Sequence, residues 1–155
     1  AMVNRAMIEL PEGTFKNAIT LASQLSTDQY RNTAFWGDDN NDGSYDTSYT
    51  LSQDMRVLSL HGTNDTTIPY DGGTVNWLSR TFIPAQDSIF YIANSLGYSS
   101  AKANGTTPLT NANIVKYEYL DGDVVHYQFI GGNHGFSGFN DDILTIIDDF
   151  ISDGI

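Results

Sequence analysis

The amino-acid sequence predicts a mixed α/β fold in a single domain over residues 1–155. Three observations predict it. An apolar run at 55–60 is typical of a buried strand. Two further strand-like runs, at 114–120 and 124–130, are joined by Asp121-Gly122, which is a strong hairpin signal. Segments in which apolar residues recur at helical spacing lie before, between and after these strands.

The first part of the chain, residues 1–54, is expected to be a helical and loop region. Residues 37–54 are rich in Asp, Asn, Gly, Ser and Thr and predict a long polar loop. Long loops in compact domains are usually functional or mobile. An amphipathic helix is expected over 13–31, because apolar residues recur there at roughly helical spacing: Phe15, Ala18, Ile19, Ala22 and Leu25.

The strand at 55–60 is expected to need partners on both edges and cover on both faces. Its outer residues are apolar, as expected of an internal strand that is covered on both faces. The three predicted strands make a sheet too small to bury it well, and an unpaired strand edge favours association with further backbone. We therefore expect something to pair with its free edge, either a second copy of the chain or a missing N-terminal half.

Helices are expected on both sides of the hairpin. Gly72-Gly73 is expected to open a mostly helical stretch, and a second helix is expected over 84–96, with proline tolerated in its first turn. The last helix is expected over 140–152, where isoleucines, a leucine and a phenylalanine form one apolar side. Asn140 or Asp141 is expected to cap it.

Composition and charge exclude several classes of function. Hydrophobic residues make up 40% of the chain and aromatic residues 12%, which is enough for a folded core. The formal net charge of −12 disfavours nucleic acids and anionic membrane surfaces as partners. No apolar run approaches the roughly 20 residues that span a bilayer. The chain has no cysteine, which excludes thiolate catalysis and disulfides. The acidic balance favours a secreted or periplasmic location over a cytoplasmic one.

Two motifs carry side chains of the kinds that act in catalysis. The first is HGTND at 61–65, which directly follows the strand at 55–60 and continues into IPYDGG at 68–73. The second is YQFIGGNHGFSG at 127–138, where a strand again ends in a glycine-rich turn. Open α/β sheets bind their ligands at the carboxyl ends of strands, so the acid and the histidine of these turns are expected at one rim.

The two motifs together resemble the polyhydroxybutyrate depolymerase and feruloyl-esterase-like branch of the α/β-hydrolases. The resemblance covers roughly residues 55–152 and departs from the family at Phe136-Ser137, where a Trp-Pro pair is usual. It implies a partial α/β-hydrolase fold, the C-terminal part of the sheet with flanking helices. It also implies hydrolysis of a carboxylic ester, small or polymeric, by a serine enzyme that requires no cofactor.

Carried onto this sequence, Asp65 matches the catalytic acid and His134 the general base. His134 would take a proton from a serine hydroxyl, and Asp65 would hold the imidazole in the right tautomer. The alternatives are that Asp65 only forms a turn and that His134 is an exposed loop residue. His61 is expected to pack at the strand end or to bond to a turn, and His126 to be structural or solvent-facing.

The nucleophile of such a triad is missing from the sequence. A Gly-x-Ser-x-Gly elbow should precede the acid, and the chain contains none. The partial matches at 135–139 and 97–101 follow a histidine and a helix, respectively, instead of a strand. Without serine and oxyanion donors, ester hydrolysis has neither an attacking group nor charge stabilisation.

Three explanations fit a missing nucleophile: a C-terminal fragment of a longer enzyme, a degenerate relative that binds without turnover, or one half of an assembly. We expect the first and therefore predict that the chain alone is inactive. The alternative function is a non-catalytic acidic binding module for calcium, carbohydrate or both.

The polar loop contains the start of a calcium-binding pattern. Oxygen ligands alternate in DDNNDGSYD at 38–46 and a glycine follows at the turn position, as in an EF-hand loop. Tyr49 stands where a bidentate acid is expected, so a complete EF-hand is not predicted. The hypothesis is a looser calcium site with the ligands Asp38, Asn40, Asp42 and Asp46, and the alternative is a solvated acidic loop.

Overall fold

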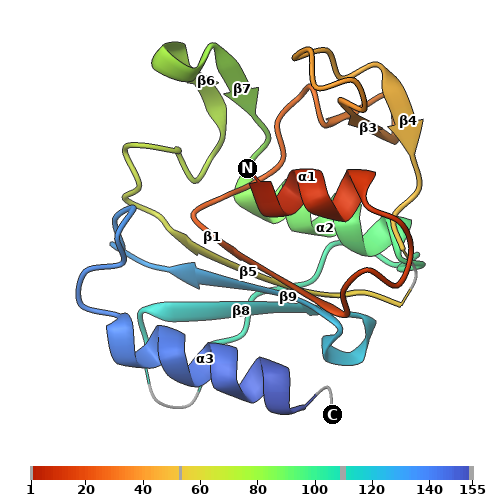
Figure 1. The fold of residues 1–155 in the computed structure, drawn as a ribbon. Coiled ribbons are helices and arrows are strands. Elements are labelled where there is room, and N and C mark those ends of the chain that lie inside the picture. The colour runs from red at the N-terminus through yellow and green to blue at the C-terminus, as the bar shows by residue number, and fades with distance from the viewer. Residues whose placement is uncertain (1, 53, 109–110, 154–155) are drawn as a thin grey trace.

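The computed structural model describes residues 2–52, 54–108 and 111–153 and has a mixed α/β fold. A four-stranded sheet in the order β1-β5-β9-β8 lies in the middle, with α1 and α2 on one face and α3 on the other (Figure 1). The elements of this layer are α1 (Met2–Glu9), β1 (Asn17–Leu21), β5 (Arg56–Gly62), α2 (Ala85–Ser95), β8 (Ile114–Tyr119), β9 (Val124–Phe129) and α3 (Asn140–Ser152).

The buried strand predicted at 55–60 is confirmed as β5. It lies between two parallel neighbours, β1 and β9, in registers that pair Leu58 with Ile19 on one side and with Val125 on the other. All its residues from Val57 to Gly62 are buried. The partner on its free edge is therefore a strand of this chain, β1, and the sheet has four strands instead of three.

The helix predicted over 13–31 is wrong, because β1 lies there and the N-terminal helix is the earlier α1. Ala18 packs on the face covered by α1 and α2, whereas Ile19 packs on the face covered by α3. A short strand that is covered on both faces shows no alternation of polar and apolar residues. The spacing of its apolar residues therefore resembled that of the apolar face of a helix.

The helical stretch predicted after Gly72-Gly73 is also wrong. The chain forms a hairpin of β6 (Gly73–Val75) and β7 (Arg80–Phe82), joined by a 3-10 turn over Asn76–Leu78. Both glycines have positive φ, 75° and 112°, which disfavours a helix start there. Val75 and Phe82 pack with Ile68 in a small separate cluster.

The polar loop predicted at 37–54 is interrupted by a short strand. β2 (Tyr30–Arg31), β3 (Ala34–Gly37) and β4 (Thr47–Tyr49) form a three-stranded antiparallel sheet, so the predicted loop is divided into a connection at 38–46 and a shorter one after Tyr49. Gln53 lies outside the described residues. Phe35 of β3 and Leu51, which follows β4, are both buried in the main core and attach this segment to it.

The C-terminal predictions hold in most details. α2 follows Pro84, β8 and β9 form the antiparallel hairpin, and α3 has the predicted bounds of 140–152. Asp121-Gly122 makes the turn, with positive φ at both residues. The predicted cap is wrong, since Phe139 precedes α3 and no side chain caps its first turn.

The parallel pairing of β5 and β9 places their carboxyl ends at one rim of the sheet (Figure 1). The two motif turns, 61–65 and 131–138, leave the sheet at this rim. None of the helices in the described ranges is both long and apolar enough to span a membrane.

Candidate active site

Two glycines bring the motif turns into direct backbone contact. A Cβ on Gly62 would lie 2.2 Å from the carbonyl oxygen of Gly132, so only glycine permits this approach. The N–H of Asn64 donates to that same carbonyl at 2.8 Å, and the N–H of Thr63 donates to Phe129 at 2.9 Å. These contacts fix the turn that carries Asp65 against the turn that carries His134.

The Asp65 carboxylate is fully buried and accepts four hydrogen bonds. Its Oδ1 accepts from the N–H groups of Thr67 at 2.8 Å and Ile68 at 2.9 Å. Its Oδ2 accepts from Nδ1 of His134 at 2.8 Å and from Nε2 of His61 at 3.2 Å. Burial by itself would raise the pKa of Asp65, but the bonds from Ile68, His134 and Thr67 outweigh it, so the pKa is lowered and the group is ionised at neutral pH.

His134 stands on the outer side of this carboxylate, with 47% of its side chain exposed. Because an ionised carboxylate only accepts, Nδ1 carries the proton in the neutral ring and Nε2 presents a lone pair. Asn133 stabilises the turn to which it belongs, because its Oδ1 accepts hydrogen bonds from the N–H groups of Gly135 and Ser137, each at 3.1 Å. Phe136 is buried against Phe129 in an edge-to-face contact and anchors the turn to β9.

The other two histidines lie inside the fold. His126 is fully buried in β9, where its Nε2 lies 3.0 Å from the Tyr70 hydroxyl and its Nδ1 3.1 Å from the Ser59 hydroxyl. Burial lowers the pKa of His126 to about 3, so this ring is neutral and structural. His61 is also buried, and its Nε2 donates to the carbonyl of Ile68 at 2.9 Å.

The contact between His61 and Asp65 escaped the sequence reasoning, which expected His61 to pack or to bond to a turn. The bond to Ile68 fits that expectation, but the bond to Asp65 brings His61 into the site. A signal was present, because a histidine inside an otherwise apolar strand end must find a polar partner.

The hydrogen bond that the structure gives His134 is the one from its Nδ1 to Asp65, and neither partial match to a nucleophile elbow supplies a serine to its Nε2. Ser137 is exposed in the same turn, and its N–H bonds to Asn133. The segment at 97–101 follows α2 and is exposed in most of its residues. The geometry thus joins an acid to a base and leaves the outer nitrogen of the base open for a group from elsewhere.

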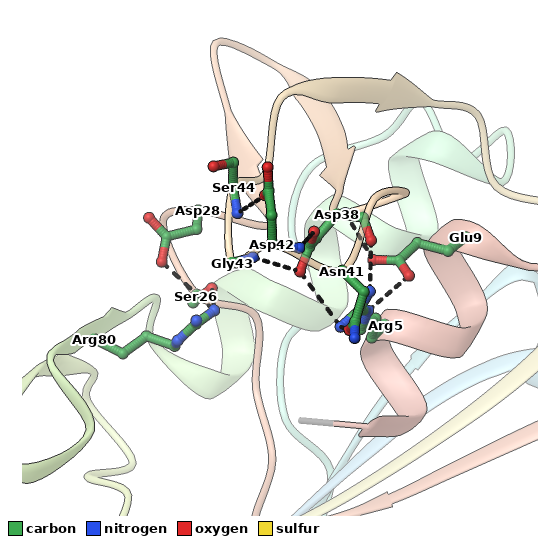
Figure 2. Close-up of polar contacts among 10 residues, drawn as sticks. All are labelled: Arg5, Glu9, Ser26, Asp28, Asp38, Asn41, Asp42, Gly43, Ser44 and Arg80. Atoms are coloured by element: carbon green, nitrogen blue, oxygen red, sulfur yellow. Dashed lines mark hydrogen bonds and ion pairs between the residues drawn. The ribbon is translucent and has the colours of Figure 1, made fainter.

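The acidic loop at 38–46 folds around an arginine (Figure 2). Asp38 is buried, with Oδ1 accepting from the N–H of Asp42 at 2.9 Å and Oδ2 from that of Gly43 at 3.1 Å. Nη1 of Arg5 lies 3.5 Å from Oδ2 of Asp38 and donates to Oδ1 of Asn41 at 3.0 Å. Nε of Arg5 also donates to Glu9 at 2.6 Å.

The four predicted calcium ligands are not gathered around one point. The Asp38 carboxylate bonds to the loop backbone and lies beside Arg5, and that of Asp42 accepts from the N–H of Ser44, while Asn40 and Asp46 are exposed. Across the described ranges, no group of three or more His, Asp or Glu side chains is arranged to hold a metal ion. The calcium site stays a prediction.

Comparison of the chain with family models, with curated proteins and with solved structures found no match. The resemblance to hydrolases therefore has no support beyond the residues of the two motifs.

Proposed function

We propose that this chain contributes the acid and the base of a serine-dependent carboxylic ester hydrolase with an α/β-hydrolase fold. The observation that carries the proposal is the bond from Nδ1 of His134 to the buried, ionised Oδ2 of Asp65 at 2.8 Å, with Nε2 of the ring open. In this arrangement His134 accepts the proton of an attacking serine and returns it to the leaving alcohol. Asp65 fixes the tautomer and stabilises the imidazolium.

The serine in this proposal comes from polypeptide outside the chain. β1 is the end strand of the sheet, so one of its edges is open among the described residues. The N-terminus of α1 lies at the rim where β1 and β5 end (Figure 1). A strand that ran parallel to β1 on its open edge and turned into α1 would deliver a strand-to-helix elbow to the rim that carries His134. This strand and its neighbours would complete the partial hydrolase fold.

The substrate class is a carboxylic ester, either a small molecule or a polymer. The chemistry needs an attacking hydroxyl, a base and donors for the oxyanion, and it needs no metal or organic cofactor. The oxyanion donors, like the serine, belong to the missing part.

The experiment compares the chain alone with the chain joined to the polypeptide encoded immediately upstream of Ala1. We expect the chain alone neither to hydrolyse p-nitrophenyl butyrate nor to react with a fluorophosphonate. The joined protein should do both, with the label on a serine of a Gly-x-Ser-x-Gly elbow. Asp65→Asn should lower its kcat by about 10⁴ through loss of the correct tautomer, and Asp148→Asn, at an exposed position of α3, is the matched control.

Two outcomes would contradict the proposal. Labelling of a serine within residues 1–155 would place the nucleophile in this chain. A joined protein that folds but neither labels nor turns over esters would leave the binding function as the better explanation.

A second candidate, carbohydrate binding, is favoured by one surface feature. A groove of about 460 Å³ between the β2–β4 sheet and α2 is lined by aromatic rings and by hydroxyl and amide groups, from Tyr30, Thr33, Phe35, Tyr49, Thr50, Tyr91 and Asn94 among others. Aromatic faces with adjacent hydrogen-bonding groups suit sugar rings. Calorimetric titration with soluble oligosaccharides tests this function, with Tyr91→Ala as the disrupting variant and Tyr98→Ala as the control outside the groove.

A further inference from the structure

We propose that His61 is a positioning residue of the site: its Nε2–H holds Oδ2 of Asp65 where that oxygen accepts the bond from His134. The catalytic importance of this contact rests on the proposed function. Its evidence is the pair of contacts that Nε2 makes, 2.9 Å to the carbonyl oxygen of Ile68 and 3.2 Å to Oδ2 of Asp65.

The proton on His61 is assigned by its partners. The carbonyl of Ile68 can only accept, so Nε2 must be the protonated nitrogen. One N–H is then shared between Ile68 and Asp65 in a three-centre bond. The pKa of His61 is lowered, chiefly by burial and in spite of the nearby carboxylate, so the ring is neutral at pH 7. His61 therefore acts on Asp65 as an oriented dipole.

The bond from His61 adds a second anchor, on the other oxygen of the carboxylate, and so narrows the torsion about the Cβ–Cγ bond of Asp65. The N–H groups of Thr67 and Ile68 hold Oδ1, but torsions that end in a planar carboxylate have broad minima. His61 lies in β5, which is paired on both sides, and its ring packs edge-on against Tyr70 at 5.5 Å. A donor on a rigid strand thus fixes Oδ2, while His134 approaches from an exposed turn.

Burial makes the bond to His61 effective. The side chains of His61 and Asp65 are 1% and 0% exposed, so water does not compete for Oδ2 from the inner side. A buried acceptor that loses a donor here has no solvent to replace it. Catalytic groups are generally held in place by such supporting bonds.

The competing explanation is that His61 only fills space and bonds to Ile68. The two explanations differ in what happens to Asp65 when the donor is removed. If Nε2–H holds the carboxylate, its loss disfavours the ionised form and raises the pKa of Asp65. If His61 only packs, stability falls while the pKa of Asp65 stays the same.

The experiment follows the ¹³Cγ resonance of Asp65 against pH in the native chain and in a pair of variants of similar size. His61→Met removes the donor, and His61→Gln places an amide N–H at the reach of Nε2. We expect the pKa of Asp65 to rise on the order of one unit in the Met variant, a tenfold change in acid dissociation, and to return toward the native value in the Gln variant. Tyr70→Phe, which keeps the ring against His61, should leave it unchanged.

A Met variant with the native Asp65 titration and only a lower melting temperature would overturn the proposal. If the Met variant does not fold, His61→Asn takes its place, because its shorter amide does not reach Oδ2 of Asp65. The same rise in the pKa of Asp65 is then expected, and an unchanged titration would overturn the proposal. Imidazole ¹⁵N spectra of the native chain are a further check, since an Nδ1–H tautomer of His61 would exclude both bonds from Nε2. Neither measurement uses catalysis, so failure of the joined protein to hydrolyse esters would reject the proposed function without deciding the role of His61.

Discussion

At the scale of single residues, the buried carboxylate of Asp65 links the site to stability. Its pKa lies below the ordinary value of 3.8, so the folded state favours the ionised form. The resulting stabilisation is complete above the unfolded-state pKa and is lost as pH falls through the folded-state pKa, that is, below about pH 4.

We therefore predict that Asp65→Asn lowers the free energy of unfolding at pH 7 by about 1–3 kcal/mol, because the amide leaves a buried donor without its acceptor. The difference from the native chain should shrink at pH 3. Urea unfolding at the two pH values measures it, with Asp148→Asn as the exposed control. An equal difference at both pH values would contradict the argument.

His126 gives a second residue-scale prediction with its own pH window. Its pKa is lowered to about 3 by burial, whereas an unfolded histidine titrates near its ordinary value of 6.5. Between these values the unfolded state binds the additional proton, so the stability falls as pH decreases from 6.5.

We expect His126 to contribute a slope of about 1.4 kcal/mol per pH unit between pH 6 and pH 4. His126→Gln, which can still bond to Tyr70 and Ser59, should remove this part of the slope. Urea unfolding at half-unit intervals measures both slopes. If the free energy of unfolding depends on pH in the same way in the native chain and the variant, the ring is not buried in its neutral form.

At the scale of elements, the sequence predicted those whose pattern is local. β5 and the β8–β9 hairpin have strong runs and clear turn residues, and α3 has one apolar side. β1 was missed because its pairing and burial depend on β5 and on helices distant in sequence. The β6–β7 hairpin was missed because the positive φ of Gly72 and Gly73 was not foreseen. For the site, the motifs predicted that Asp65 and His134 would share a rim, and the register of β5 with β9 accounts for it. The bond from His61 to Asp65 depends on side-chain geometry that no spacing encodes.

The contact of α1 with the loop at 38–46 yields an element-scale prediction. The guanidinium of Arg5 supplies positive charge to the buried carboxylate of Asp38 and bonds to Asn41. A calcium ion at this loop would have to compete with that charge. We expect millimolar calcium to raise the melting temperature of Arg5→Gln more than that of the native chain.

Scanning calorimetry with calcium and with magnesium measures the difference, and Arg80→Gln, which removes a cation near the same loop, is the control. The absence of a calcium effect in both proteins would reject the calcium hypothesis for Asp38, Asn40, Asp42 and Asp46.

At the scale of the whole molecule, two features have opposite effects on the association of the chain with other copies of itself. The net charge of −12 makes copies of the chain repel one another. The open edge of β1 presents unpaired backbone groups, and Leu21 at the end of this strand is 46% exposed. An open parallel edge next to exposed apolar side chains favours association with another strand. Because salt screens the charge but not the edge, ionic strength separates the two effects.

We predict that the isolated chain associates increasingly with concentration and that 0.3 M NaCl strengthens the association. Leu21→Lys should weaken it, because a lysine on an edge strand opposes further pairing. The matched control is Leu144→Lys, since Leu144 is 67% exposed on α3, on the opposite side of the sheet from α1. Size-exclusion chromatography with light scattering measures the mass of each. A native chain that stays monomeric at every concentration and salt level would contradict an edge that requires a partner, and with it the structural support for a missing sheet half.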